Sequence, residues 1–571
     1  MILALTGVPL VIVSIIAFIL ILGIIIIIHE GGHFFFARRA GILCHEFSIG
    51  MGPAIYKKKF GETTFCIRAI PIGGYVSMAG EEVTSELIKV GEQIGVNLLD
   101  GKVSEIVTIE DAEAQIRGEV VELDLYGKDG NPLFITIYDG FQNQYYEVLR
   151  DAFYVMKKDS KMQITPYDRS FESKTILQRF LTLFAGPFMN FILAIVLYLI
   201  VSFATGVPNY NSNVIGAVST TNTSMVEKAP DGTLSTKLKK GDQIQKVNGV
   251  EVANWKEMSK ELDKLLENAT TKVQIEVLRN EQPIQIELDC YTYIVSLGIS
   301  NMQVDIEKPF PEGVSGVRLG AIGLRYLDDG KKGEYPIASG DILTKIRMDK
   351  VNPDKTITTG EVEEIQSWDQ LIAMFKDADI VNVYFEYYSY KKEGIVSIED
   401  CATLQTYGNE VLENQRIDKI EVKLGISPKM KFDFFQSIGN AFVDFWNDFT
   451  LIFRTLGLLL FPSSSGIRQV GVNDLSSFVG IFDLVKTFVG SGFLSLLAFM
   501  AMLSVNIGVM NLLPIPALDG GRIVFLGYEL VTRRKPSKKV ENIINNVFFI
   551  LLLILFVYVT YNDILRMIRK G

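Results

Sequence analysis

An uncharged apolar run at the start of the chain is the feature that most limits how this sequence can fold. Residues 1–28 include no charged side chain, and the motif HEGGH follows them directly. A helix rises about 1.5 Å per residue, so this run can cross the roughly 30 Å of hydrocarbon in a bilayer. A cleaved signal peptide fits poorly, because no basic residue precedes the run and HEGGHFFF stands where a cleavage site belongs. The run therefore predicts a transmembrane helix within residues 1–40.

Similar apolar runs follow at residues 181–203, 492–513 and 547–559. Hydrophobic residues make up 48% of the chain and its mean hydropathy is +0.25, a value that purely soluble proteins rarely reach. The predicted fold class is a polytopic α-helical membrane protein with four transmembrane helices. Beyond the first, these helices are expected within residues 173–207, 490–522 and 540–564.

Lysine and arginine residues indicate on which side of the membrane each loop lies. Arg38 and Arg39 end the first run, Lys174 and Arg179 precede the second, and RRKPSKK separates the last two. Cytoplasmic loops carry an excess of such residues. Both termini, and the long stretch between the second and third runs, are therefore predicted to lie outside the cytoplasm.

This outer stretch contains an internal repeat. LKKGDQIQKVNGVEVANWKEM and IASGDILTKIRMDKV share a Gly-Asp pair followed by alternating apolar positions, and a tryptophan follows later in each copy, Trp255 and Trp368. A turn, a strand, a second turn and a helix headed by the tryptophan would produce this pattern. In the second copy a longer loop precedes the tryptophan.

The two copies, at residues 208–300 and 301–430, resemble PDZ domains. Such α/β domains bind extended peptides by adding a strand to a sheet edge, often capturing a peptide terminus. A spacer domain without a ligand is the alternative.

The motif HEGGH places two imidazoles and a carboxylate where the first run ends. His29 and His33 are four residues apart, so on a helix they share one face and can reach one cation, with Glu30 beside them. Inside a membrane a charged side chain costs roughly 2.5–3.5 kcal/mol, which favours a function for these residues. Two histidines that only hydrogen-bond between helices are the alternative.

Two histidines do not complete a catalytic zinc site, which usually has three protein ligands and a water. The missing ligand is expected to be an acid at the same depth in another membrane segment. Asp519, in NLLPIPALDGG at the end of the third run, is the sole acidic residue between Asp483 and Glu529. A simple helix-terminal turn is the alternative for DGG.

HEGGH and NLLPIPALDGG, with PDZ-like domains between them, resemble the motifs of the site-2 protease family of intramembrane zinc metalloproteases. The similarity is to its PDZ-bearing bacterial branch, the regulator of sigma-E protease type, and implies the plasma membrane of a bacterium. It also implies that His29, His33 and Asp519 bind Zn2+ and that Glu30 is the general base. Asn511 would help to position the substrate or its polarised carbonyl.

The resemblance further implies a membrane-associated β-hairpin within residues 41–80. Its strand IPIGGYVSM would hold an unwound substrate as an added strand, with Ile72, Gly73, Gly74 and Tyr75 as substrate-binding residues. Equally, Gly73 and Gly74 would simply form the turn of the hairpin.

Two other segments are predicted to lie at the membrane surface or beside it. Residues 81–172 form a largely polar cytoplasmic insertion, which is expected to be folded because VVELDLYGKDGNPLFITIYDG alternates like a β-hairpin around KDGN. Residues 431–465 are aromatic-rich and interrupted by Asp444, Asp448 and Arg454, a pattern typical of an amphipathic helix lying on the membrane.

The sequence thus predicts an intramembrane zinc endopeptidase that hydrolyses peptide bonds in or near the membrane segments of single-pass proteins. By resemblance, its substrates would be anti-sigma factors or remnant signal peptides. The alternative is an inactive membrane scaffold or receptor that binds peptide termini through the PDZ-like domains. A metal transporter would need further acids or histidines in the membrane, which the second and fourth runs lack. The net charge of -10 and the lack of a long basic block exclude nucleic-acid partners.

Overall fold

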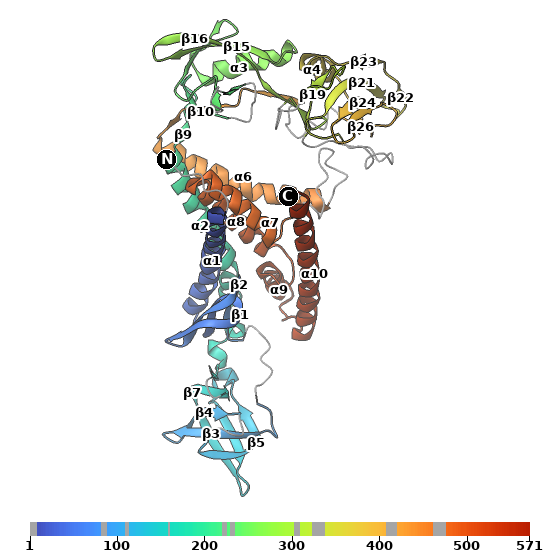
Figure 1. Ribbon diagram of the computed structural model, residues 1–571. Helices are drawn as coiled ribbons and strands as arrows, with labels where there is room; N and C mark the ends of the chain where they lie inside the picture. The colour runs from blue at the N-terminus through green and yellow to red at the C-terminus, as the bar shows by residue number, and fades with distance from the viewer. Residues whose placement is uncertain are drawn as a thin grey trace. The chain divides into compact units, whose positions relative to one another are not determined.

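The computed structural model describes residues 8–570 except 81–87, 109–112, 158–159, 220–224, 229–233, 302–308, 322–336, 407–418 and 461–474. The chain divides into two compact units. The first comprises Met1–Ala204, Ile438–Thr455 and Gly471–Gly571, and the second comprises Thr205–Ser437 and Leu456–Val470. Figure 1 labels the elements of both.

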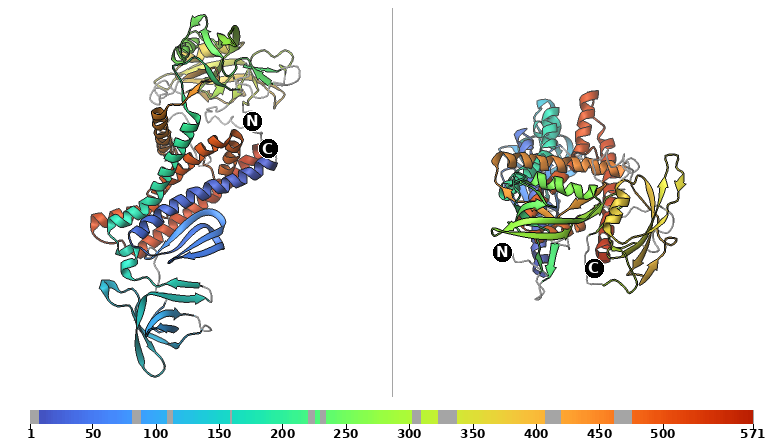
Figure 2. Two further views of the ribbon diagram at one scale, coloured as in Figure 1. Left: turned by 90° about the vertical axis from the view of Figure 1, so that its left-hand side faces the viewer. Right: turned by 90° about the horizontal axis from the view of Figure 1, so that it is seen from above.

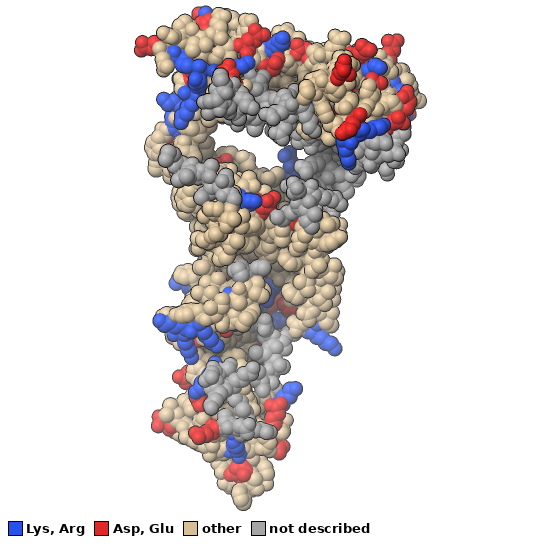
Figure 3. Space-filling model, in the orientation of Figure 1, with Lys and Arg blue, Asp and Glu red and all other residues tan. Residues whose placement is uncertain are grey.

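Four helices of the described chain are long and apolar enough to cross a membrane. They are α1 (Val8–Arg39), α2 (Ile176–Thr205), α8 (Phe493–Leu512) and α10 (Lys538–Lys570). They coincide with the four apolar runs, so the prediction of a polytopic helical membrane protein is confirmed. On the face shown in Figure 3, the region of these helices carries few charged side chains.

Two further helices pack against this group. The aromatic-rich segment forms α6 (Phe434–Leu460), which is not among the four candidate spans, and α7 (Phe478–Ser491) precedes α8. Fully buried side chains from α1, α2, α6, α7 and α8 form one apolar core, among them Ile25, Ala194, Ala441, Val485 and Ala501.

The third spanning helix ends earlier than the sequence indicated. α8 stops at Leu512, and a separate helix, α9 (Asp519–Thr532), begins after a short turn. Pro514 and Pro516 in this turn have no backbone N–H, so they cannot continue a helix. The predicted boundary of residues 490–522 is therefore wrong at its end, and Asp519 is the first residue of α9.

The predicted β-hairpin is present as β1 (Cys44–Phe60) and β2 (Thr63–Met78). Its strands are long and bent, so Ile49 of β1 pairs with Gly74 near one end of β2 and with Ile67 near the other. Figure 2 shows the hairpin alongside α1. Its turn lies at residues 61–62, and Gly73 and Gly74 lie inside β2, so the alternative that these glycines form the turn is wrong.

The insertion is folded, as predicted. It forms a six-stranded sheet of β3 (Gln93–Leu99), β4 (Lys102–Val107), β5 (Ile116–Asp124), β6 (Phe134–Tyr138), β7 (Asn143–Lys157) and β8 (Ser160–Gln163), in the order β4-β3-β5-β6-β7-β8. An additional pairing of β4 with β7 closes this sheet into a small barrel. β5 and β6 are the hairpin expected around KDGN.

Among the β-sheets of the second unit, two are each accompanied by one helix. The first sheet joins β13 (Gln243–Val247), β14 (Val250–Glu251), β15 (Lys272–Arg279) and β16 (Gln282–Asp289), and α3 (Trp255–Glu267) accompanies it. The second is built around β21 (Ile342–Val351) and β24 (Val381–Ser389), with α4 (Trp368–Lys376). In both, a tryptophan heads the helix, as the repeat predicted.

The repeated Gly-Asp pair has the same structural role in both sheets. Asp242 Oδ2 accepts a hydrogen bond from the backbone N–H of Lys239 at 2.8 Å, and Asp341 Oδ2 accepts one from Ala338 at 2.9 Å. The longer loop of the second copy contains β22 (Ile357–Thr358) and β23 (Val362–Glu364), which both pair with β21.

Candidate metal centre

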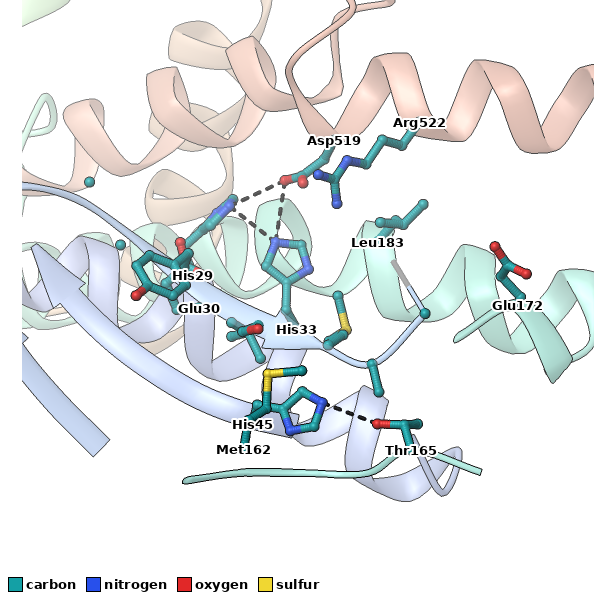
Figure 4. Close-up of a pocket in the computed structure, with 18 of the residues that line it drawn as sticks. His29, Glu30, His33, His45, Met162, Thr165, Glu172, Leu183, Asp519 and Arg522 are labelled. Atoms are coloured by element: carbon teal, nitrogen blue, oxygen red, sulfur yellow. Dashed lines mark hydrogen bonds and ion pairs between the residues drawn. The ribbon is translucent and has the colours of Figure 1, made fainter. Parts of the chain in front are cut away.

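His29 and His33 lie one turn apart on α1, and both face Asp519 at the start of α9 (Figure 4). His29 Nε2 is 3.2 Å from Asp519 Oδ2, and His33 Nε2 is 3.3 Å from the same oxygen. The two Nε2 atoms are 3.3 Å apart. The three atoms therefore form a nearly equilateral triangle, and both histidines are buried.

This triangle has the dimensions of three corners of a tetrahedral zinc site. Zinc binds imidazole nitrogen and carboxylate oxygen at about 2.0–2.2 Å, which places neighbouring tetrahedral ligands about 3.3 Å apart. Two imidazoles and a carboxylate also leave one position open, as catalytic sites require. In the described part of the chain, no other group of three or more His, Cys, Asp and Glu side chains comes together in this way. The residues present therefore fit a zinc ion.

Two glycines allow α1 and α2 to approach closely at the histidines. A Cβ atom on Gly32 would lie 2.4 Å from the carbonyl oxygen of Ala185, and one on Gly186 would lie 2.2 Å from His33 Nε2. Favourable non-bonded contacts between heavy atoms lie near 3.5–4.0 Å. Gly186 therefore leaves the space that the His33 ring occupies.

The second nitrogen of each histidine ring also has a partner, and both partners are on α2. His33 Nδ1 is 2.8 Å from the carbonyl oxygen of Thr182, and His29 Nδ1 is 3.2 Å from Asn190 Nδ2. Thr182 and Asn190 are fully buried. Neither residue was predicted from the sequence, although Asn190 is an amide in the middle of an apolar run, which is a signal of function in a membrane segment.

The turn before α9 brings Asp519 back toward α1. Ala517 has a positive φ of 76°, and a Cβ atom on Gly520 would lie 2.1 Å from the carbonyl oxygen of Leu513. The DGG motif is therefore the first part of α9 and is not the turn, and the turn before it presents the carboxylate to the histidines. Arg522, also missed by the sequence analysis, lies beside Asp519 on α9 (Figure 4).

Comparisons with known proteins agree with this geometry. The family model of peptidase family M50 matches residues 17–555. The chain belongs to peptidase family M50.

Relatives of this M50 peptidase are similar over nearly their whole length. SACOL1281 of Staphylococcus aureus (strain COL) is 30% identical, with 97% of this chain and 98% of the relative covered. The zinc metalloprotease RasP of Shouchella clausii is 30% identical over 97% of this chain and 99% of its own. RasP of Geobacillus kaustophilus is 28% identical over 96% and 97%.

Membership of the family confirms the resemblance to site-2 proteases. The chain is a zinc-dependent metalloprotease of a bacterial membrane.

In this M50 peptidase a cavity of about 1190 Å³ opens beside the candidate metal centre. His29, Glu30, His33 and Asp519 line it, together with Asn511 at the last turn of α8. The sequence-predicted residues Gly73, Gly74 and Tyr75 of β2 line it as well. The side chain of Ile72 lies outside the described part of the structure.

β2 comes close to α1 at Glu30 because Gly74 has no side chain. A Cβ atom there would lie 2.8 Å from Ile26 Cγ2 and 3.0 Å from Glu30 Cγ. The next residue, Tyr75, donates a hydrogen bond from its hydroxyl to Glu46 at 2.7 Å and accepts one from Arg68 at 2.7 Å. Burial and the Glu46 carboxylate raise the pKa of Tyr75 to about 12, so its hydroxyl stays protonated at neutral pH.

Proposed function

We propose that this protease hydrolyses peptide bonds within or near the transmembrane segments of single-pass membrane proteins. The observation that carries the proposal is the triangle of two Nε2 atoms and one Oδ2 atom, which opens into a cavity beside membrane helices. An inactive scaffold that binds peptide termini would have no use for Glu30 beside three side chains that together can hold a metal ion.

His29, His33 and Asp519 would hold the zinc ion, whose Lewis acidity lowers the pKa of water and polarises a carbonyl. Glu30 lines the same cavity beside them. Its carboxylate would accept the proton of the attacking water and pass it to the leaving amine. The Asn511 amide, at the last turn of α8, would donate a hydrogen bond to the substrate carbonyl.

The position of β2 supports a mode of substrate binding in which the substrate pairs with this strand. A transmembrane helix has its backbone groups hydrogen-bonded internally, so it must unwind before its carbonyls can be attacked. Among the described strands, β1 alone pairs with β2. The stretch that includes Ile72, Gly73, Gly74 and Tyr75 would bind the unwound segment as an added strand.

Charge placement supports an orientation in the membrane. Arg38 and Arg39 end α1, Lys174 precedes α2, and Arg533 and Arg534 follow α9. These residues would face the cytoplasm, and both termini and the second unit would then lie outside it. There the two sheet domains would act as PDZ-like modules that select peptide termini, with anti-sigma factors or remnant signal peptides as the substrate class.

The proposal is tested with purified protein in liposomes, as the wild type and as Glu30→Gln. A panel of short single-pass substrates is incubated with both while bound zinc is quantified. The expected result is cleavage by the wild type, at least about 100-fold less by Glu30→Gln, and near-stoichiometric zinc in both. Zinc without cleavage of any substrate would favour the scaffold. Equal cleavage by both proteins would contradict the role of Glu30.

A further inference from the structure

His29 and His33 differ in the hydrogen-bond partner of their Nδ1 atom. His33 Nδ1 faces the Thr182 carbonyl oxygen, which can only accept, so Nδ1 carries the proton and Nε2 has a free lone pair. His29 Nδ1 faces Asn190 Nδ2, which can only donate. In that arrangement Nε2 of His29 carries the proton. A protonated Nε2 cannot bind a metal ion.

The side-chain oxygen of Asn190 could accept a hydrogen bond from His29 Nδ1 and so leave His29 Nε2 unprotonated. Its Oδ1 is buried and has no hydrogen-bond partner among the described residues. Rotation of the amide by 180° places Oδ1 where Nδ2 stands, opposite His29 Nδ1. This rotation does not require the backbone of Asn190 to move. That backbone is held by the Ser504 hydroxyl, which donates a hydrogen bond to the Asn190 backbone carbonyl oxygen at 2.8 Å.

We propose that Asn190 is a positioning residue for the metal centre. In the zinc-loaded protein its Oδ1 accepts a hydrogen bond from His29 Nδ1, which holds the ring in the tautomer whose Nε2 can bind the metal. Hydrogen bonds of this kind commonly orient metal-binding histidines and raise their basicity. This inference rests on the proposed role of His29.

Zinc affinity tests the proposal without reference to activity. Full-length protein in detergent is titrated against a chelator as the wild type, Asn190→Leu and Asn190→Asp. Loss of the acceptor in Asn190→Leu is expected to weaken zinc binding about 10–100-fold. Asn190→Asp keeps an acceptor and is expected to retain wild-type affinity and the wild-type absorption bands of the cobalt-substituted site. If Asn190→Leu does not fold, the zinc affinity of Asn190→Asp is the result that tests the proposal.

Two variants serve as controls. Asn506→Leu removes an amide from α8 that does not line the cavity, and its zinc affinity is expected to be unchanged. His29→Leu is expected to lose zinc. Zinc retained by His29→Leu would overturn the proposed site together with this inference. Zinc lost by His29→Leu but bound with wild-type affinity by Asn190→Leu, or lost equally by Asn190→Asp, would overturn this inference alone.

A second observation concerns the far wall of the cavity. Leu123, Asp124, Leu125, Tyr126, Tyr154, Met162 and Glu172 line it, and all come from the insertion at residues 81–172; we call these residues the insertion wall. Figure 4 shows Met162 and Glu172 of this wall in the same cavity as the histidines. The insertion therefore contributes directly to the space that begins at the metal centre.

Several contacts fix the insertion to the β-hairpin. Arg169 donates to both carboxylate oxygens of Glu62 at 2.7 Å, and Thr165 Oγ1 lies 3.1 Å from His45 Nε2. The hydrogen bonds from Arg169 lower the pKa of Glu62 to about 2, so this ion pair persists at neutral pH. These contacts hold the insertion against β1 and the turn of the hairpin.

The insertion wall carries the carboxylates Asp124 and Glu172 and contains no lysine or arginine, whereas Arg522 lines the cavity from α9. Transmembrane segments are flanked on their cytoplasmic side by excess lysine and arginine. The cavity is also larger than a typical small-molecule pocket of about 300–1,000 Å³, and apolar and aromatic side chains make up the rest of the wall. These features suit an extended polypeptide that carries basic residues.

We infer that the insertion wall is a substrate subsite for the basic residues that flank the membrane segment on its cytoplasmic side. This deepens the proposed function and depends on it. Glu172, whose Oε2 lies 3.5 Å from the Tyr126 hydroxyl, would pair with a substrate lysine or arginine.

The test compares two otherwise identical single-pass substrates, one with a lysine flank and one with a glutamate flank. For the lysine substrate, Glu172→Gln is expected to raise KM about two- to fivefold, as loss of a partly exposed ion pair does, with kcat unchanged. The glutamate substrate should show no such change. Glu119→Gln, an exposed carboxylate on β5 outside the cavity, is the matched control.

Equal KM values for both substrates with the wild type, or no effect of Glu172→Gln, would overturn the subsite while leaving the proposed protease intact. Failure of the wild type to cleave either substrate, with zinc bound, would overturn the proposed function and the subsite with it.

Discussion

Buried polar side chains serve different purposes in the two units of the molecule. In the second unit, Asp242 and Asp341 are almost completely buried, and each accepts a backbone N–H from the turn to which it belongs. In the helical unit, His29, His33 and Asn190 are buried against one another, although α1 and α2 are far apart in the sequence. In the sheets, Asp242 and Asp341 each close a local turn. Among the membrane helices a buried polar group joins separate segments and indicates chemistry.

The largest expected effect tests whether the helical unit holds the metal. Asp519→Ala removes one of the three proposed ligands, and bound zinc is expected to fall to background. Metal analysis of the purified protein, with a size-exclusion profile to confirm folding, measures this. Asp519→Glu, which keeps a carboxylate, serves as the conservative control. Stoichiometric zinc in Asp519→Ala would contradict the claim that polar side chains of the helical unit bind the metal.

A second variant tests how closely the helices must pack. Gly186→Ala would place a Cβ atom 2.2 Å from His33 Nε2, whereas a Cβ atom on Gly490 meets nothing within 4 Å. Gly186→Ala is therefore expected to lower zinc affinity strongly, and Gly490→Ala to leave it unchanged. Chelator competition on both variants measures the difference. Equal affinities would mean that α2 can shift away from the histidine at little cost.

A third variant tests a buried ion pair that joins two segments of the helical unit. Arg179 on α2 donates to both carboxylate oxygens of Glu529 on α9, at 2.9 and 2.8 Å, and both side chains are largely buried. Arg179→Leu leaves a buried carboxylate unpaired and is expected to destabilise the unit by about 3–5 kcal/mol. Thermal unfolding in detergent measures this. The double variant Arg179→Leu/Glu529→Leu should recover part of the loss, and a single variant as stable as the wild type would contradict the account.

The smallest effect is expected in the second unit. Asp242→Ala removes the acceptor of the turn N–H and the partner of Arg279, at a cost of about 1–3 kcal/mol. Limited proteolysis of the second unit should become faster, while zinc content should not change. Loss of zinc in this variant would show that the two units are coupled.

Much of the difference between the helical unit and the sheets of the second unit could be predicted from the sequence. Polar residues are rare in lipid, so HEGGH and Asp519 were conspicuous, and the four apolar runs gave the four candidate spans. The repeat of Gly-Asp and tryptophan predicted the turn, strand and helix found twice in the second unit.

What the sequence did not predict depends on contacts between distant segments. The role of Gly186 appears only when α2 packs on His33, and Thr182 acts through a backbone carbonyl, which no side chain reveals. The break between α8 and α9 was signalled by Pro514 and Pro516, but the motif was interpreted as the end of one continuous helix. Gly73 and Gly74 were ambiguous because a glycine pair suits both a turn and a close approach to a helix.

X-ray absorption at the zinc edge tests directly whether His29, His33 and Asp519 bind the zinc ion. The expected spectrum of the wild type is fitted by two imidazole ligands and additional oxygen at about 2.0–2.1 Å, with no sulfur. One fewer imidazole is expected in His33→Leu if that variant retains zinc. A sulfur scatterer near 2.3 Å would place the zinc on cysteines and contradict the assignment of His29, His33 and Asp519.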